Sequence, residues 1–114
     1  MKRLILEMGT GNDLYGGDYT KAACRAVQDA IHHSSLTMFR ALELDPTRMQ
    51  IELTIAAQEP EKVDCDKVAK KLPYGTVTAK VVHGGLNIDD VEVEGQEPRK
   101  SVIVNASLVV RYPL

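Results

Sequence analysis

Apolar and polar residues alternate along four segments of the chain, which is the period expected of strands that bury one face. In the clearest of these segments, Met49, Ile51 and Leu53 alternate with polar neighbours. In the longest segment every second residue from Val102 to Val110 is apolar, while the other face is mixed and carries Ile103 and Val109 beside polar residues. The predicted strands are residues 2–8, 49–58, 77–83 and 100–112.

The first predicted strand has apolar residues on both sides. Strict alternation places Leu4, Leu6 and Met8 on one face and Ile5 and Glu7 on the other. We expect the face with three apolar residues to meet the core, so Ile5 and Glu7 are expected on the opposite face of the sheet.

Two amphipathic helices are predicted between the strands. Asp18 can cap the first, in which Ala23, Ala26 and Ala30 recur at helical spacing. The small alanine side chains predict that this helix lies close to the sheet. Asp64 caps the second helix, which stops at residues 73–75.

The order strand, helix, strand, helix, strand, strand predicts an α+β fold. We expect a two-layer sandwich, with a roughly four-stranded sheet and the two main helices on one face. No linker or repeat divides the chain, so residues 1–114 are predicted to form a single domain.

Composition indicates an ordinary globular protein of 114 residues, with 44% apolar and 26% charged residues. The net charge of −2 argues against nucleic acid as a partner, and no apolar run is long enough to span a membrane. We therefore expect a cytoplasmic protein. Cys24 and Cys65 show no metal or disulfide spacing and are expected to be reduced, partly buried thiols. No metal or cofactor is predicted.

The sheet face away from the helices predicts self-association. Threonines, amides and scattered valines suit a surface that meets copies of itself, and we expect a homo-oligomer, most simply a trimer. The alternative is an ordinary solvated face on a monomer. The residues expected on this face are Ile5, Glu7, Gln50, Glu52, Thr54, Thr78, Lys80, Ile103, Asn105, Ser107, Val109 and Arg111.

The segment after the first strand is rich in glycine and polar residues. We expect it to form a loop whose backbone N–H groups bind a ligand, although a plain turn has the same composition. The dinucleotide and P-loop motifs are absent. The candidate ligand-binding residues here are Gly9, Thr10, Gly11, Asn12 and Asp13.

His83 is the first candidate for chemistry, because the pKa of histidine lies near neutrality and this residue ends a strand. Ser107 and Lys80 form a candidate nucleophile and base on the polar sheet face. Lys21 and Arg111 are candidates for holding an anionic group. Gly84 and Gly85, directly after His83, are candidate ligand contacts, and His32 and His33 have a structural interpretation as helix-end residues.

Three runs of the sequence resemble a family of bacterial conserved hypothetical proteins of about the same length, which implies no assigned function. They are residues 9–14, the run from 17 to 33 apart from positions 24 and 28, and residues 81–85; the likeness also includes the terminal strand and extends over nearly the whole chain. Residues 10–20 and 83–85 are also similar to the repeat unit of the cyanuric acid hydrolase and barbiturase group. Those ring-opening amidohydrolases carry three units around a barrel, which implies three copies here and a pocket between subunits. In that group a lysine and a serine occupy the positions of Gly9 and His83, so this chain departs from the Ser-Lys pattern.

Two functions follow as alternatives. The first is an oligomeric protein or enzyme, hydrolase-like if catalytic, that acts on a small polar carbonyl or amide metabolite at a subunit interface. The second is a structural or regulatory homo-oligomer without pocket chemistry.

Overall fold

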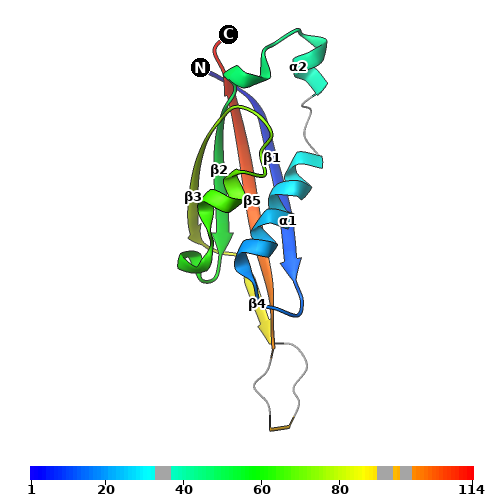
Figure 1. Ribbon diagram of the computed structural model, residues 1–114, viewed down its shortest axis with the longest axis vertical. Coiled ribbons are helices and arrows are strands. Elements are labelled where there is room, and N and C mark those ends of the chain that lie inside the picture. Colours follow the sequence, from blue (N-terminus) through cyan, green and yellow to red (C-terminus); the bar gives the residue numbers. More distant parts are fainter. Residues whose placement is uncertain (33–36, 90–93, 96–98) are drawn as a thin grey trace.

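A mixed five-stranded sheet carries its helices on one face, as the computed structural model in Figure 1 shows. The structure describes residues 1–32, 37–89, 94–95 and 99–114. The strands are β1 (Lys2–Asp13), β2 (Gln50–Ala57), β3 (Thr76–His83), β4 (Leu86–Asp89) and β5 (Lys100–Tyr112); the helices are α1 (Tyr19–His32), α2 (Thr37–Ala41) and α3 (Cys65–Ala69), with two short 3-10 turns at Pro46–Arg48 and Pro60–Lys62. The α+β class and the two-layer arrangement are confirmed.

Strand β5 lies at the centre of the sheet. The order is β1-β5-β2-β3, with β5 antiparallel to both of its neighbours and β2 parallel to β3. The short strand β4 also pairs with β5, beyond the end of β2. Segment 86–89, which is not among the predicted strands, is therefore a fifth strand. Residues 90–93 and 96–98, which follow it, lie outside the described residues.

The core lies between α1 and the centre of the sheet. Helix α1 packs on β1 and β5, and α3 packs on β3 and against α1 (Figure 1). Ala23, Ala26 and Ala30 are fully buried, as the sequence predicts. The side chains of Asp18 and Asp64 accept backbone N–H bonds at the starts of α1 and α3, so both predicted caps are confirmed.

Glycines bring α1 unusually close to β1. A Cβ atom on Gly9 would clash with the backbone carbonyl oxygen of Ala26, and one on Gly11 would clash with that of Ala22. Residues 9–13 are therefore part of β1 and do not form the predicted loop. Glycine inside a strand marks such close backbone approaches, and the loop proper is confined to residues 14–18.

The two faces of β1 are exchanged relative to the prediction. The pairing with β5 shifts register between Arg3 and Ile5, so Ile5 enters the core at 6% exposure, whereas Leu6 and Met8 are 46% and 70% exposed on the open face. A bulge of this kind adds one residue to a strand and inverts the alternation that follows it. The assignment of Ile5 and Glu7 to the open face was wrong, and that face is more apolar than predicted.

Gly84 and Gly85 connect β3, which pairs with β2, to β4, which pairs with β5. Gly85 has a φ of +66°, and a Cβ on it would clash with the carbonyl oxygen of Ile103. The Gln58 amide holds this turn by donating to the carbonyl oxygens of Gly84 and Gly85 at 2.9 and 3.1 Å. These glycines therefore have a structural role at the strand exchange.

Among the described helices, none is long and apolar enough to cross a membrane. Cys24 and Cys65 are free thiols with intermediate exposure.

Candidate functional site

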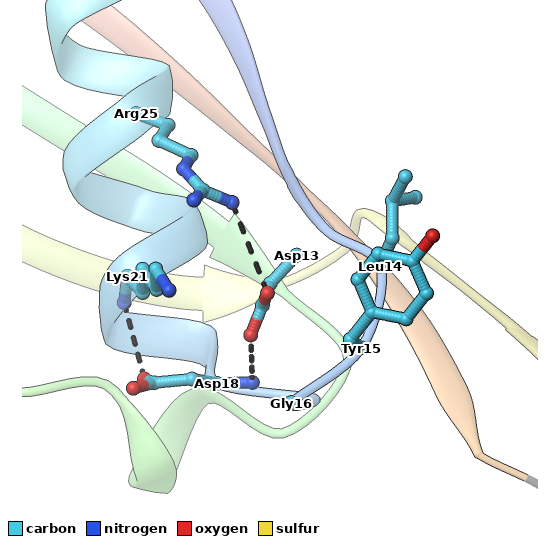
Figure 2. Close-up of a pocket in the computed structure, with 7 residues that line it drawn as sticks. All are labelled: Asp13, Leu14, Tyr15, Gly16, Asp18, Lys21 and Arg25. Atoms are coloured by element: carbon cyan, nitrogen blue, oxygen red, sulfur yellow. Dashed lines mark hydrogen bonds and ion pairs between the residues drawn. The ribbon is translucent and has the colours of Figure 1, made fainter.

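An open cleft lies where β1 ends and α1 begins, with a volume of about 500 Å³. Asp13 at the end of β1 lies between the basic side chains of α1 and the loop residue Tyr15 in the view of Figure 2. The residues that line the cleft are Asp13, Leu14, Tyr15, Gly16, Asp18, Lys21 and Arg25. Of the predicted ligand-binding residues, the structure brings Asp13 and Lys21 together here; Arg25 was missed.

The Asp13 carboxylate organises this cleft. It is 6% exposed, and its Oδ2 accepts the backbone N–H of Asp18 at 2.9 Å, while Arg25 Nη1 lies 3.8 Å from its Oδ1. The Asp18 carboxylate in turn accepts the backbone N–H of Lys21 at 3.1 Å. The carboxylates therefore fix the start of α1, and no carboxylate among the described residues forms an ion pair with the Lys21 ammonium.

The expected nest of free N–H donors at residues 9–13 is not present. The backbone N–H of Thr10 donates to the Asp29 carboxylate of α1 at 2.9 Å, and Arg25 donates to the carbonyl oxygen of Asn12. The Thr10 N–H and the Asn12 carbonyl oxygen lie on the edge of β1 that faces away from β5. Because both are already hydrogen-bonded to side chains, another strand cannot pair with them. The Asp29 carboxylate thus accepts the Thr10 N–H that an external ligand was expected to use.

The candidate catalytic residues are not gathered in one place. In the sheet register, Thr54 lies opposite both Ser107 and Lys80, so the latter two are separated by a strand, about 10 Å between their backbones. His83 pairs with Ala57, whose side chain is buried on the helix side of the sheet, yet His83 itself is exposed. His83 therefore lies on the opposite face of the sheet from Lys80 and Ser107, and the catalytic roles of all three stay predictions.

Arg111 lies far from the cleft. It pairs with Arg3 near the start of β1, whereas Asp13 pairs with Val102, and the two positions are about 30 Å apart along β5. Its Nε donates to the Glu52 carboxylate at 2.8 Å. Arg111 and Asp13 of one subunit therefore cannot hold the same small ligand.

A hydrogen-bonded group that the sequence reasoning missed lies beside the cleft. The Tyr19 hydroxyl donates to Glu59 Oε2 at 2.8 Å and accepts from Asn87 Nδ2 at 2.6 Å. Burial raises the pKa of Tyr19, while the Tyr19 hydroxyl and then Lys62 lower the pKa of Glu59. Because Glu59 and Asn87 are 40 and 68 residues from Tyr19, no local pattern indicates this group.

The lowered pKa of Glu59 predicts an acid-dependent loss of stability. A carboxylate whose pKa is lower in the folded state stabilises the fold above its unfolded value, and the stabilisation disappears as pH falls through the folded value. We expect Glu59→Gln to flatten the fall of the thermal midpoint between about pH 5 and pH 3. Glu61→Gln, in the same exposed turn, is the matched control; identical curves for the two variants would contradict the assignment.

His32 ends α1 and is exposed, and His33 lies outside the described residues. Within the described ranges, no three His, Cys, Asp or Glu side chains are grouped closely enough to hold a metal ion.

Comparisons with known proteins extend over nearly the whole chain. Residues 3–110 match the family model described as "Conserved hypothetical protein (Lin0512_fam)". A solved FtsZ-like protein of unknown function from Nostoc punctiforme is 34% identical, with a TM-score of 0.84 over 99% of this chain and 97% of that one. No curated protein matches the chain. The similarity to ring-opening amidohydrolases is not shown and stays a prediction.

Proposed function

We propose a ligand-binding function for this chain, which belongs to the Lin0512_fam family of conserved hypothetical proteins. In this proposal the cleft at the start of α1 binds a small polar metabolite. The metabolite carries a carbonyl or anionic oxygen, and a second copy of the chain completes the pocket. Because neither the family nor the solved relative has an assigned function, the proposal rests on the chemistry of the cleft.

The observation that carries the proposal is that two exposed cations, Lys21 and Arg25, line the cleft, while its buried carboxylate, Asp13, forms an ion pair with Arg25 alone within the described part of the chain. Asp13 is held by the Asp18 N–H and by Arg25, whereas the Lys21 ammonium has no carboxylate partner among the described residues. An anionic or carbonyl oxygen in the cleft would accept hydrogen bonds from Lys21 and Arg25, and charge-assisted bonds of this kind are the strong ones.

The open face of the sheet supports an oligomer. Leu6, Met8, Val82, Leu86 and Ile88 are all between 39% and 70% exposed, and the pairing register places them on the side away from α1. Monomeric proteins rarely leave a large contiguous apolar patch in water. We propose a closed homo-oligomer, most simply a trimer, in the cytoplasm and without a nucleic-acid or membrane partner.

Catalysis forms a further part of the proposal and depends on that assembly. Among the residues that the structure describes, the lining of the cleft contains no serine, cysteine or histidine. An amidohydrolase-like reaction would therefore require a second subunit to bring His83, or Ser107 with Lys80, to the ligand.

Two measurements test the proposal. Light scattering behind a sizing column should give the mass of three subunits or a multiple of three. The mass of a monomer would contradict a pocket that is shared between subunits. Thermal shift against cyclic amides, ureides, nucleobases and small carboxylates should then find a ligand, since one at ~100 times its Kd stabilises the native state by about 2.7 kcal/mol.

The variant Lys21→Gln should abolish that shift, whereas Lys70→Gln, which removes an exposed lysine outside the cleft, should keep it. An unchanged shift in Lys21→Gln would place the ligand elsewhere.

The exposed apolar face also favours the second candidate, a structural or regulatory homo-oligomer without a ligand. It predicts a stable oligomer and no response to the panel. Substitution of Met8 by lysine should then lower the oligomer mass, while Lys21→Gln should change nothing.

A further inference from the structure

A second cleft lies on the other side of the loop that follows β1. Its volume is about 330 Å³, and it shares Tyr15 and Gly16 with the first cleft. The residues that line it are Tyr15, Gly16, Gly17, Tyr19, Glu59, Lys62, Arg99, Lys100 and Val102. Three of these side chains are cationic and one is a carboxylate, so the wall has an excess of positive charge.

Tyr19 and Glu59 contribute a hydrogen-bonded group to the lining of this cleft. Tyr19 is 5% exposed, and its hydroxyl is bonded to both Glu59 and Asn87.

The positive charges are only partly neutralised. Lys62 Nζ lies 3.1 Å from Glu59 Oε1, which uses the one carboxylate in the lining. Across the described residues, neither Arg99 nor Lys100 forms an ion pair with a carboxylate. The Arg99 guanidinium instead lies 5.7 Å from the centroid of the Tyr15 ring.

We propose that this second cleft binds a multiply charged oxyanion of the phosphate class, with Arg99 and Lys100 as its main contacts. Arg99 and Lys100, which have no carboxylate partner among the described residues, provide more positive charge than a ligand with a single carboxylate would neutralise. The planar guanidinium of Arg99 also matches two oxygens of one phosphate. Tyr15, 71% exposed, holds Arg99 by a cation–π contact and offers its ring to a planar part of a larger ligand. Tyr19 and Glu59 fix the position of Lys62 at the side of the site.

The site is separate from the one in the proposed function. Lys21 and Arg25 line only the first cleft of the two, and Arg99 and Lys100 line only the second. A phosphate in the second cleft does not require a metabolite in the first. The two sites can therefore fail independently in experiments.

Isothermal titration of the full-length protein with inorganic phosphate tests the proposal at low salt. We expect saturable binding that weakens with added salt, because exposed charges are screened. The double variant Arg99→Gln/Lys100→Gln should weaken phosphate binding by about tenfold or more, because it removes both charge-assisted contacts. The matched control, Lys2→Gln/Lys70→Gln, removes the same charge outside the cleft and should change affinity by less than about twofold.

Pyrophosphate and citrate separate the sources of the oxyanion. Tighter binding of pyrophosphate than of citrate supports a phosphate site, and the reverse order would assign the site to carboxylates and overturn the proposal. The proposal would also be overturned if about 10 mM phosphate gave no saturable heat. Equal losses of phosphate affinity in the double variant and its control would overturn it as well. Because Lys21→Gln should leave phosphate affinity unchanged, its result keeps this proposal distinct from the first.

Discussion

Gly11→Ala is expected to destabilise the fold by about 3 kcal/mol or more, the upper part of the range for overpacked cores. The added Cβ meets the carbonyl oxygen of Ala22 and the backbone of Arg25 and Ala26, so the whole helix α1 must move away from β1. Glycine-to-alanine changes in a strand otherwise gain about 0.5–1 kcal/mol. Urea denaturation monitored by circular dichroism measures the change in the free energy of unfolding.

Two further variants decide whether the close approach of the backbones is the cause. Gly16→Ala makes the same chemical change in the loop, where the atom nearest to the added Cβ is a side-chain oxygen of Asp13 at 2.9 Å. This variant should lower the free energy of unfolding clearly less than Gly11→Ala. Gly11→Ala/Ala22→Gly should stay unstable, because trimming the helix side chain leaves the clashing backbone in place. A full rescue by Ala22→Gly would contradict the geometry.

Gly85→Ala is expected to lower the free energy of unfolding about as much as Gly11→Ala does, because two unfavourable effects add. Its φ of +66° is a left-handed conformation, which costs other residues roughly 1–2 kcal/mol. The new Cβ also clashes with the carbonyl oxygen of Ile103, at the point where the chain steps from β3 to β4. We expect the free energy of unfolding to fall by about 3 kcal/mol, with loss of the β4 pairing.

Gly17→Ala is the matched control for this second result. Gly17 has a φ of +60°, but its nearest neighbour beyond the adjoining residues is the carbonyl oxygen of Lys100 at 3.6 Å. Only the backbone cost of about 1–2 kcal/mol should remain. Equal losses in Gly85→Ala and Gly17→Ala, measured by urea denaturation, would mean that the strand exchange tolerates a side chain.

These glycines change the interpretation of the most distinctive part of the chain. Residues 9–11 were predicted to bind a ligand through free N–H groups, whereas the structure uses Gly9 and Gly11 to seat α1 on β1. The side chains of α1 then close the edge of β1 through Arg25 and Asp29. The candidate cleft lies farther along the chain, where Asp13 meets the start of α1.

Four of the five strands, the first helix and the α+β class followed from local periodicity. The alternation of residues 49–58 and 100–112 predicted the strands β2 and β5, and the spacing of Ala23, Ala26 and Ala30 predicted the buried face of α1. Both caps, Asp18 and Asp64, were also predicted. Such features depend on contacts within a few residues, so one sequence is enough to show them.

Only the tertiary structure decided which face of β1 meets the core and which polar residues share a cleft. The register shift between Arg3 and Ile5 depends on pairing with β5, about a hundred positions later, and no local pattern encodes it. In the same way, Tyr19 meets Glu59 and Asn87 only because α1, the turn after β2 and strand β4 pack together. Periodicity sets the elements because it is local, whereas register and site geometry depend on long-range contacts that form when those elements pack.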